Sequence, residues 1–301
     1  MKKLFAAFLL FALIIGCLGC SVQDITPAPS ASSPTVSNDP SRLTVHFIDV
    51  GQADSALLEH DGQFVLIDGG YQSTGDELVD YLLDHGVEEL SLVIATHLHG
   101  DHLGGLPAVL EAFPVQRIWC SSQTYYSYTY DQFCKLADQQ DVPIETPRIG
   151  ETVVLGDVHL KLLGPLNPPY TDLNNSSLVV MATHINNRFL FTGDMRHEAE
   201  LELVEAGTDL KADVLKVGHH GSYTSTSYLF LRTVQPKHAV ISCGRNNEYG
   251  HPHSAPVSRL RDADVNIFRT DKLGTILAVS DGTNISFTWE FTNAQPEWNA
   301  A

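Results

Sequence analysis

The sequence has few basic residues. Lysine and arginine number 18 against 36 aspartate and glutamate, which gives a formal net charge of -18 at pH 7. A field of this sign repels polyanions at long range, so an interaction with nucleic acid would have to depend on local features. Residues 232–272 hold seven basic residues against four acidic ones and are locally positive. A mixed, solvated surface accounts for those charges equally well.

Cysteine is also scarce in the body of the chain. Of five cysteines, two lie within the first 20 residues, and only Cys120, Cys134 and Cys243 follow. An odd number at wide spacing excludes a disulfide framework of the kind that stabilises small secreted domains. We expect these three residues to be buried as small apolar side chains.

The N-terminus lacks an apolar run long enough for a membrane span. Residues 4–15 are twelve apolar residues, fewer than the roughly 20 that cross a bilayer. Two lysines precede this run and small residues with cysteine follow it, as in a secretory signal peptide. Residues 1–20 resemble a bacterial lipoprotein leader, in which Cys17 or Cys20 would be acylated. We therefore expect an exported protein, lipid-anchored on the outer face of the bacterial cytoplasmic membrane, although an uncleaved N-terminal anchor predicts the same side.

Composition divides the remaining chain into a tether, a domain and a tail. Residues 21–41 are rich in proline, serine, alanine and threonine, which predicts a disordered tether, although a tail without function has the same composition. Residues 42–292 alternate strand-like runs with helical patterns, and residues 293–301 form a short tail. This alternation predicts a single layered α/β domain of two sheets flanked by helices.

The expected strands and helices follow from apolar periodicity and turn residues. Strands are expected over residues 43–50, 55–59, 64–68, 92–96, 179–183, 189–192, 214–217, 239–242, 267–270, 275–279 and 285–289. Helices are expected over residues 74–85, 103–113, 130–139, 226–234 and 255–262.

The strongest chemical signal is the run H-L-H-G-D-H at residues 97–102, directly after an apolar strand and before a Gly-Gly pair. Imidazole and carboxylate groups suit zinc, and also manganese or iron when oxygen ligands are added. The turn from strand to helix can direct His97 and His99 toward one ion and Asp101 and His102 toward a second. A histidine-rich surface loop is the alternative, which this spacing and context disfavour.

Further segments give the chain a family resemblance. H-x-H-x-D-H followed by Gly-Gly is the signature of the metallo-β-lactamase fold. Over about residues 43–290 the chain resembles the extracellular hydrolase domain of ComEC-type competence proteins. The segments that carry this resemblance are F-I-D-V-G-Q-A-D-S at 47–55, L-I-D-G-G at 66–70, N-N-S-S-L at 174–178, V-G-H-H-G-S at 217–222 and Y-G-H-P at 249–252.

The resemblance implies an αββα sandwich with a two-metal site at one edge of the sheets. Asp194 would bridge both ions, because a carboxylate has two oxygens and a full charge to offset two dications. Read alone, it would be an ordinary strand-end aspartate. One of His219 and His220 would complete the second ion's shell and the other would touch substrate, since adjacent side chains at a strand end diverge. His220 is weakly favoured as the ligand.

The chain departs from the family pattern at two places. Asn174 and Asn175 stand where better-known branches of the superfamily carry a metal-binding histidine. The first ion would then have only His97, His99 and Asp194, which leaves it weakly bound or open to manganese. The other departure is Ala53, where ComEC-type sequences usually have glycine. Its methyl group is harmless unless that backbone needs a positive φ.

Other residues are expected to bind substrate or to take part in proton transfer. His251 would act as a general acid or contact the metal, with a structural histidine as an equal alternative. Asn175, Ser222 and Ser225 are candidates for binding a phosphate, and the two serines would look the same as helix caps. The tyrosine-rich run at residues 125–130 could stack bases or a choline group, or pack half-buried.

Three carboxylates are expected to support the metal ligands. Asp49, Asp54 and Asp68 lie in the first strand-turn regions, where they more readily brace ligand loops than catalyse. Carboxylates in this position orient metal-binding histidines through the second ring nitrogen.

Together these features predict a phosphodiester hydrolase with two divalent ions, zinc or manganese. The ions would generate a nucleophilic water near neutral pH, oriented by Asp101, while His251, His219 or His220 assists the leaving group. The leading substrate is extracellular DNA or another nucleic acid, cleaved by a free-standing lipoprotein. The alternatives are a phosphorylcholine esterase of cell-wall polymers, a non-catalytic binding lipoprotein and, more weakly, a β-lactamase.

Overall fold

The computed structural model describes residues 41–297. The expected leader with Cys17 and Cys20, nearly all of the tether and the last four residues of the tail lie outside the described residues. None of the helices within residues 41–297 has the length and apolar character that a membrane crossing requires. Within the same part of the chain, Cys120 and Cys243 are buried, Cys134 is half-buried, and all three are free thiols.

The first sheet has the strand order β15-β14-β1-β2-β3-β4-β5-β6. Neighbours from β15 to β3 pair antiparallel, whereas β3, β4, β5 and β6 run parallel. The strands are β1 (Leu43–Phe47), β2 (Ala56–His60), β3 (Gln63–Ile67), β4 (Leu92–Ala95), β5 (Ile118–Cys120), β6 (Ile144–Glu145), β14 (Ile276–Ser280) and β15 (Ile285–Trp289).

The second sheet has the order β13-β12-β11-β10-β9-β8-β7. Strands β7 to β10 pair antiparallel, and β10 to β13 run parallel. The strands are β7 (Thr152–Leu155), β8 (Val158–Gly164), β9 (Val179–His184), β10 (Asn187–Phe191), β11 (Val214–Lys216), β12 (His238–Ile241) and β13 (Asn266–Arg269).

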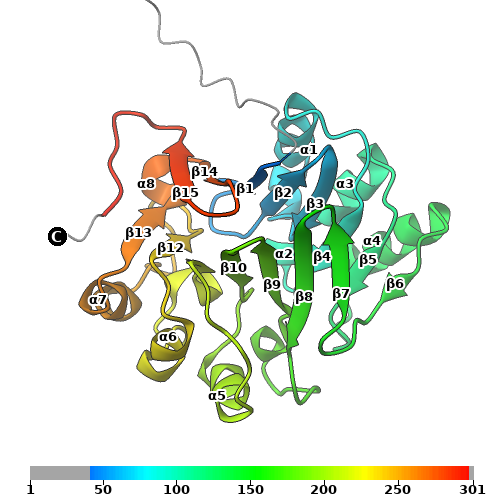
Figure 1. Cartoon of the computed structure of the whole chain (residues 1–301). Helices are drawn as coiled ribbons and strands as arrows, with labels where there is room; N and C mark the ends of the chain where they lie inside the picture. The colour runs from blue at the N-terminus through cyan, green and yellow to red at the C-terminus, as the bar shows by residue number, and fades with distance from the viewer. Residues whose placement is uncertain (1–40, 298–301) are drawn as a thin grey trace, which may run out of the picture. The chain divides into compact units, whose positions relative to one another are not determined.

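Helices cover the outer face of the first sheet and part of the outer face of the second, where β7 and β8 are left open (Figure 1). The α-helices are α1 (Gly75–Asp84), α2 (Gly100–Leu103), α3 (Leu106–Ala112), α4 (Tyr128–Gln139), α5 (His197–Glu205), α6 (Tyr228–Val234), α7 (Ser254–Asp262) and α8 (Thr270–Leu273). The short 3-10 turns are η1 (Gln72–Thr74), η2 (Leu173–Ser176) and η3 (Gly218–Gly221). Helices α1, α3 and α4 pack on the first sheet, and α5, α6 and α7 pack on the second.

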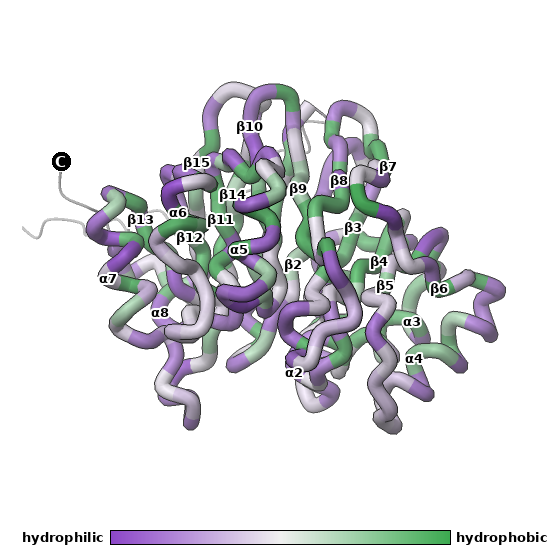
Figure 2. The backbone as a smooth tube through the Cα atoms, turned by 90° about the horizontal axis from the view of Figure 1, so that it is seen from below, coloured by the Kyte–Doolittle hydropathy of each residue, from purple (hydrophilic) through white to green (hydrophobic). Residues whose placement is uncertain are grey.

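Strand alternation sorts the apolar side chains into three layers. Val65 and Ile67 of β3 lie between the two sheets, whereas Leu66 between them faces the helices. Between the sheets, the ring of Phe47 on β1 stacks on that of Phe191 on β10, with centroids 6.0 Å apart. Figure 2 shows the hydrophobic colouring concentrated on the strands of both sheets. The predicted sandwich of two sheets flanked by helices is confirmed.

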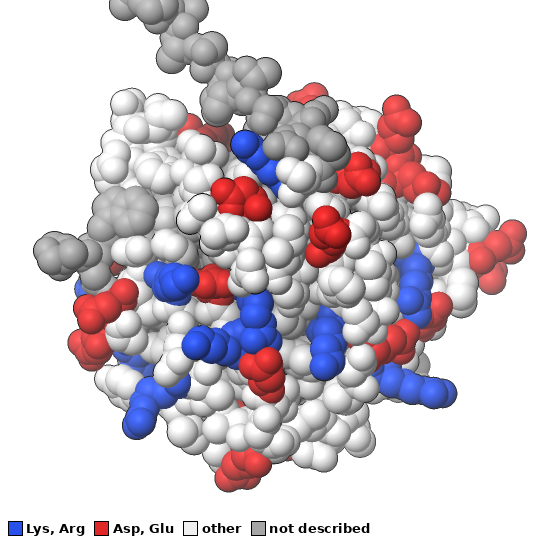
Figure 3. All heavy atoms as spheres, in the orientation of Figure 1, with Lys and Arg blue, Asp and Glu red and all other residues white. Residues whose placement is uncertain are grey.

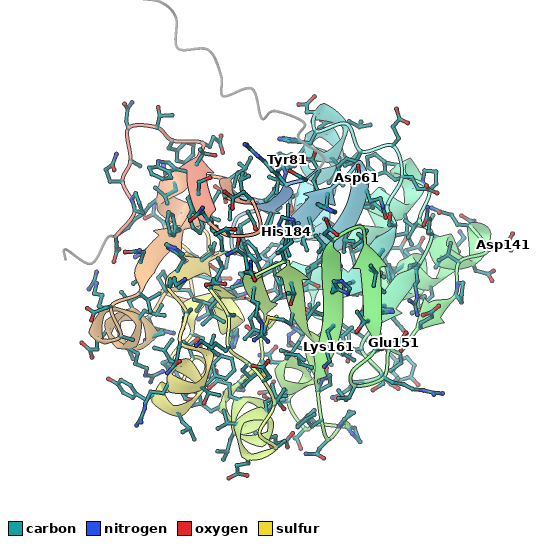
Figure 4. All side chains as sticks on the ribbon, in the orientation of Figure 1. Asp61, Tyr81, Asp141, Glu151, Lys161 and His184 are labelled. Atoms are coloured by element: carbon teal, nitrogen blue, oxygen red, sulfur yellow. The ribbon has the colours of Figure 1, made fainter. Side chains whose placement is uncertain are left out.

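Four consecutive strands and a helix escape the sequence reasoning. Strands β5 to β8 and helix α5 are present in the structure but are not among the elements expected from the sequence. Strand β8 does alternate, with Leu160 buried between the sheets and Lys161 exposed on the open outer face (Figure 4). In place of the helix expected at 103–113, α2 ends at Leu103 and α3 begins at Leu106; Gly105 between them lies so close to the first sheet that a Cβ would be 2.1 Å from the Gly69 carbonyl oxygen. Ala53 is buried and does not have a positive φ, so its methyl group is tolerated.

Parallel strands bring distant loops to one edge of the sandwich. The loops after β3 and β4 in the first sheet and after β10, β11 and β12 in the second follow the carboxyl ends of parallel strands. Carboxyl ends of parallel strands meet at the same edge of a sheet, where ligands commonly bind in α/β proteins. These loops hold the chemically notable segments of the sequence.

Candidate metal centre

Four side chains from both sheets converge on one point. Asp101, His102, Asp194 and His220 each contribute one ligand atom, and these atoms all lie within 4.8 Å of one another. Nε2 of His102 lies 3.2 Å from an oxygen of Asp194, and Nε2 of His220 lies 3.2 Å from an oxygen of Asp101. We call this set the compact cluster. It joins the loop after β4 to the loops after β10 and β11.

The compact cluster fits a divalent metal ion. Nε2 of His102 and Oδ1 of Asp194 are both buried and have no hydrogen-bond partner, although they face each other. Leaving buried polar atoms unsatisfied is costly, and native proteins rarely do so without a function for them. Two carboxylates and two imidazoles are a donor set for zinc, or for manganese when more oxygen ligands are added.

Asp68 fixes the orientation of His102. Its Oδ1 accepts the Thr96 backbone N–H at 2.8 Å, and its Oδ2 accepts the Thr96 hydroxyl at 2.7 Å and His102 Nδ1 at 2.8 Å. Burial raises the pKa of Asp68, although His102 opposes this. With Nδ1 engaged by a carboxylate, Nε2 of His102 is directed at the centre, as metal-binding histidines usually are.

Asp54 lies beside His220, the other histidine of the compact cluster. One oxygen of Asp54 lies 3.2 Å from His220 Nδ1, and the other lies 2.7 Å from the ammonium group of Lys216. Nδ1 of His220 also donates to the Ser242 carbonyl oxygen at 3.1 Å. Lys216 on β11 is buried and donates as well to the Val217 carbonyl oxygen at 2.9 Å. Asp54 therefore has a cation and an imidazole as partners in a buried position.

The other expected ligands, His97 and His99, form a looser pair. Nε2 of His97 lies 3.1 Å from Nδ1 of His99, and the His97 ring packs 4.1 Å from that of His102. Nδ1 of His97 faces two hydroxyl oxygens, of Thr96 at 3.3 Å and of Ser177 at 3.4 Å. Among the described residues, this pair does not join Asp194 in a group as tight as the compact cluster.

Charges within the compact cluster are complementary. Burial alone would raise the pKa of Asp194, but His220 and His102 outweigh it and hold that pKa well below its usual value. Burial alone would lower the pKa of His220, but Asp194 and Asp54 raise it to about 10. Since histidine must lose its proton to bind metal, an ion at this site would replace protons as the partner of the carboxylates.

His219 and His220 diverge because of their backbone. Both have left-handed conformations, with φ of 51° and 53°, a region that non-glycine residues seldom occupy. Such residues cost about 1–3 kcal/mol each and cluster at functional sites. His220 turns inward and is buried, whereas His219 remains 22% exposed with its Nε2 3.7 Å from Asp194. His220, the favoured ligand in the sequence, is thus the one in the compact cluster.

His251 lies beside the cluster. Its ring centroid is 5.6 Å from that of His219 and 6.1 Å from that of His220. Burial, followed by the nearby His220 and His219, lowers the pKa of His251 to about 4. The ring is therefore neutral near pH 7 and carries a single N–H.

The structure does not support a substrate-binding role for three expected residues. Asn175 is buried, donates to Glu198 at 2.8 Å and accepts the Arg196 backbone N–H at 3.0 Å, so its amide holds the start of α5. Ser225 is buried and donates to the Met195 carbonyl oxygen at 2.7 Å. Ser222 is also buried, and its hydroxyl accepts the Thr224 hydroxyl at 3.0 Å.

Asp49 likewise does not brace a ligand. Its side chain is exposed and accepts the backbone N–H of Gly51 at 3.2 Å. The turn that leaves β1 directs Asp49 outward, whereas Asp54 at the other end of the same loop is buried beside His220. Of the three carboxylates that the sequence suggests as supports, Asp54 and Asp68 contact cluster histidines and Asp49 does not.

Three residues near the cluster escape the sequence reasoning. Lys216 could have been noticed, because a lysine at the end of an apolar strand is unusual unless it has a buried partner. Gln52 contacts His251 across 199 positions of sequence, and no local pattern signals such a contact. Arg196 forms an ion pair with Asp172. Burial is the main cause of the lowered pKa of His219; Asp194 opposes it, and the positive charges of His220 and Arg196 add to it.

Comparison with known proteins agrees with the fold. Residues 48–245 match the Metallo-beta-lactamase superfamily. The chain is 34% identical over 250 residues to ComE operon protein 3 of Bacillus subtilis, an alignment that covers 77% of this chain and 32% of that protein. It is also 34% identical over 221 residues to Recombination protein 2 of Haemophilus influenzae, which covers 72% of this chain and 26% of that protein. The chain thus spans about a third or less of the length of these relatives.

Among solved structures, the fold is similar to that of the metallo-beta-lactamase fold protein YhfI from Bacillus subtilis. The TM-score is 0.56 at 12% identity, and the match covers 79% of this chain and 99% of that one. The sequence resemblance to ComEC-type competence proteins is confirmed by the relatives above. Because the family model matches residues 48–245, well over half of the chain, the chain belongs to the metallo-beta-lactamase superfamily.

Proposed function

We propose that this protein is a metal-dependent hydrolase that cleaves phosphodiester bonds, with DNA or another nucleic acid as its substrate. The observation that carries the proposal is the compact cluster, in which two buried atoms that face each other have no hydrogen-bond partner. Such an arrangement is expected where a cation binds between the two atoms. The similarity to competence proteins favours nucleic acid over other phosphodiesters.

Different residues of the chain would hold each of the two ions. Asp101, His102, Asp194 and His220 would hold one ion, and His97 and His99 with Asp194 would hold the other. Zinc or manganese bound there supplies a nucleophilic water at neutral pH and offsets charge on phosphoryl oxygens.

Two side chains remain accessible for the reacting groups. Asp101 is 22% exposed, and its pKa is held below the usual value because His220 and His102 outweigh the effect of burial. Its carboxylate can accept a hydrogen bond from the attacking water and so orient it. His251, neutral and half-buried, can donate a hydrogen bond to the leaving oxygen.

Surface charge offers little help in binding a polyanion. Figure 3 shows basic and acidic side chains interspersed on one face of the molecule. The basic residues of the locally positive stretch 232–272 are partly paired with carboxylates: Lys237 with Asp213, Arg261 and Lys272 with Glu297, and Arg269 with Asp271. Affinity for nucleic acid would then come from the metal centre and from aromatic side chains at its rim.

Exposed tyrosines beside the cluster support a second candidate, a phosphorylcholine esterase. Tyr126 is 89% exposed, and the neighbouring Tyr125 packs its ring edge-on to His99 at 6.1 Å. Such rings can stack nucleobases or hold a quaternary ammonium group. Competition separates the two: free choline should inhibit a phosphorylcholine esterase, whereas it should leave cleavage of nucleic acid unchanged.

The first experiment compares Asp101→Asn with the native protein on bis-nitrophenyl phosphate and on plasmid DNA, with metal content measured by elemental analysis. We expect turnover to fall by about 10²-fold or more in the variant while the fold is retained. The matched control is Asp138→Asn on the exposed side of α4. Full activity of Asp101→Asn would refute the assignment of that residue. Metal bound without turnover of either substrate would instead indicate a non-catalytic binding protein.

We further propose export and lipid anchoring through Cys17 or Cys20, with residues 21–41 as the tether. The proposal rests on the signal-peptide pattern of residues 1–20. In bacterial cells, Cys17→Ala and Cys20→Ala would be compared by incorporation of labelled palmitate. We expect one substitution to abolish labelling, and labelling that survives both would contradict the anchor.

A further inference from the structure

Gln52 connects two distant loops beside the compact cluster. It lies between β1 and β2, and its side-chain Oε1 accepts the backbone N–H of Gly244 at 3.0 Å, across 192 positions of sequence. Its Nε2 lies 3.1 Å from Nδ1 of His251. The two contacts together determine how the amide group is oriented.

The orientation of the amide determines where the proton of His251 sits. A backbone N–H can only donate, so the atom of Gln52 that meets Gly244 must be the oxygen. The nitrogen then faces His251 and donates, so Nδ1 of His251 must accept. A neutral imidazole carries one proton, and here that proton is on Nε2.

Close packing prevents Gln52 from leaving this position. A Cβ on Gly244 would lie 2.7 Å from the backbone nitrogen of Gln52 and 3.1 Å from its Cβ, so only glycine permits the approach. Asn247 fixes the other partner: its Oδ1 accepts the His251 backbone N–H at 2.9 Å, and its Nδ2 donates to the His251 carbonyl oxygen at 2.6 Å. Both the backbone and the ring of His251 are therefore held.

The second nitrogen of His251 remains available. Nε2 has no hydrogen bond to any described residue, and the ring is half-buried beside His219 and His220. The Nε2–H is thus the donor that this ring presents to a molecule in the metal centre.

We propose that Gln52 is a positioning residue that holds His251 in its Nε2–H tautomer, so that His251 donates a hydrogen bond to a phosphoryl or leaving oxygen of the substrate. The catalytic part rests on the proposed function above. A carboxylate at position 52 would act in the opposite sense. It could still accept the Gly244 N–H with one oxygen, but the other oxygen would accept from Nδ1, which moves the proton of His251 away from Nε2.

The tautomer can be observed directly in the metal-free full chain. At about pH 8, above the ordinary pKa of histidine, long-range ¹H–¹⁵N spectra report which ring nitrogen is protonated. His251→Asn identifies the His251 signals by their loss. We expect the native protein to have an unprotonated Nδ1 and a protonated Nε2, Gln52→Glu to have a protonated Nδ1, and Gln52→Ala to have a mixture. A proton on Nδ1 in the native protein, or no change in Gln52→Glu, would overturn the proposal.

Kinetics then test the consequence with bis-nitrophenyl phosphate and the metal-loaded protein. We expect Gln52→Glu to lower kcat by about 10- to 100-fold with unchanged metal content, since hydrogen-bonding groups in the transition state contribute effects of this order or larger. Gln63→Glu, at an exposed position of β3, adds the same charge as a control and should leave kcat unchanged.

The outcomes separate this inference from the proposed function. If the native protein hydrolyses the ester and Gln52→Glu does so equally well despite a reversed tautomer, the catalytic part of the inference is wrong and the proposed function stands. If the native protein binds metal but hydrolyses no phosphodiester, the proposed function fails, while the spectra still decide whether Gln52 sets the tautomer.

Discussion

The two halves of the metal centre differ in how the chain supports them. In the compact cluster, His102 and His220 each have a buried carboxylate at the second ring nitrogen, Asp68 at 2.8 Å and Asp54 at 3.2 Å. In the looser half, His97 faces only the hydroxyls of Thr96 and Ser177 at its Nδ1. A carboxylate orients an imidazole and raises its basicity more than a neutral hydroxyl does. From this difference we expect the compact cluster to bind its ion more tightly than the looser half would bind a second one.

Asp194 is the residue that the two halves would share, so its loss should have the largest effect. We expect Asp194→Asn to lose both ions and at least about 10²-fold in turnover, because both halves would share its carboxylate. Elemental analysis after dialysis, together with turnover of bis-nitrophenyl phosphate, measures this. Asp138→Asn, on the exposed side of α4, is again the control. Retention of both ions would remove Asp194 from the centre.

Single histidine substitutions test whether the halves are unequal. We expect His220→Ala to weaken the tighter ion by about 10²-fold or more, a larger loss than removal of a supporting carboxylate. His97→Ala should instead abolish binding of the weaker ion and leave the affinity of the tighter one nearly unchanged. Competition with a chromophoric chelator yields the dissociation constants of both ions. Equal losses in the two variants would show that the halves are equivalent.

The supporting groups should follow the same ranking with smaller effects. Asp68→Asn and Asp54→Asn should each weaken the tighter ion by about 10- to 100-fold. Ser177→Ala should change affinity only a few-fold, because a neutral hydroxyl does less than a carboxylate to orient an imidazole. The same chelator competition applies, with Asp84→Asn at the exposed end of α1 as the control. A Ser177→Ala loss as large as that of Asp68→Asn would contradict the ranking.

Removal of metal should have the smallest effect on the molecule as a whole. The three apolar layers are complete without an ion, so the chelated protein should stay folded. At about 100 times Kd, a ligand stabilises the folded state by about 2.7 kcal/mol, which corresponds to roughly 5–10 °C in Tm for a domain of this size. Calorimetry with and without chelator measures the shift. Loss of the folded state on chelation would mean that the ions are part of the core.

The sequence predicts those parts of the site whose residues are neighbours along the chain. His97 to His102 stand out because several ligands follow one apolar strand, and the alternation of β3 and β10 predicts the two-sheet core. Asp194 and His220 needed a family resemblance, since each stands almost alone in its segment. The left-handed backbone of His219 and His220 has no local signal other than the flanking glycines.

Contacts that cross the fold could not be predicted in this way. The partner of Gln52 is set by the approach of two loops that only the packed sheets bring together. Asn175, Ser222 and Ser225 looked suited to phosphate because they are polar and near the motifs, but they are buried and hydrogen-bond to other groups of the protein instead. Strand β7 lies at a sheet edge, where one face is open to solvent and the apolar pattern is correspondingly weak.

The buried pair of Asp54 and Lys216 constrains how this protein could be redesigned. Asp54 precedes a strand of the first sheet and Lys216 ends a strand of the second, so their 2.7 Å contact is a cross-link between the sheets. Removing one member of such a pair leaves an unpaired charge that costs about 3–5 kcal/mol. A designer who alters Asp54 to change metal preference would therefore also lower the tolerance of the domain to every other mutation. His97 and His99 are not part of an ion pair between the sheets, so substitutions there should reduce the stability of the domain less.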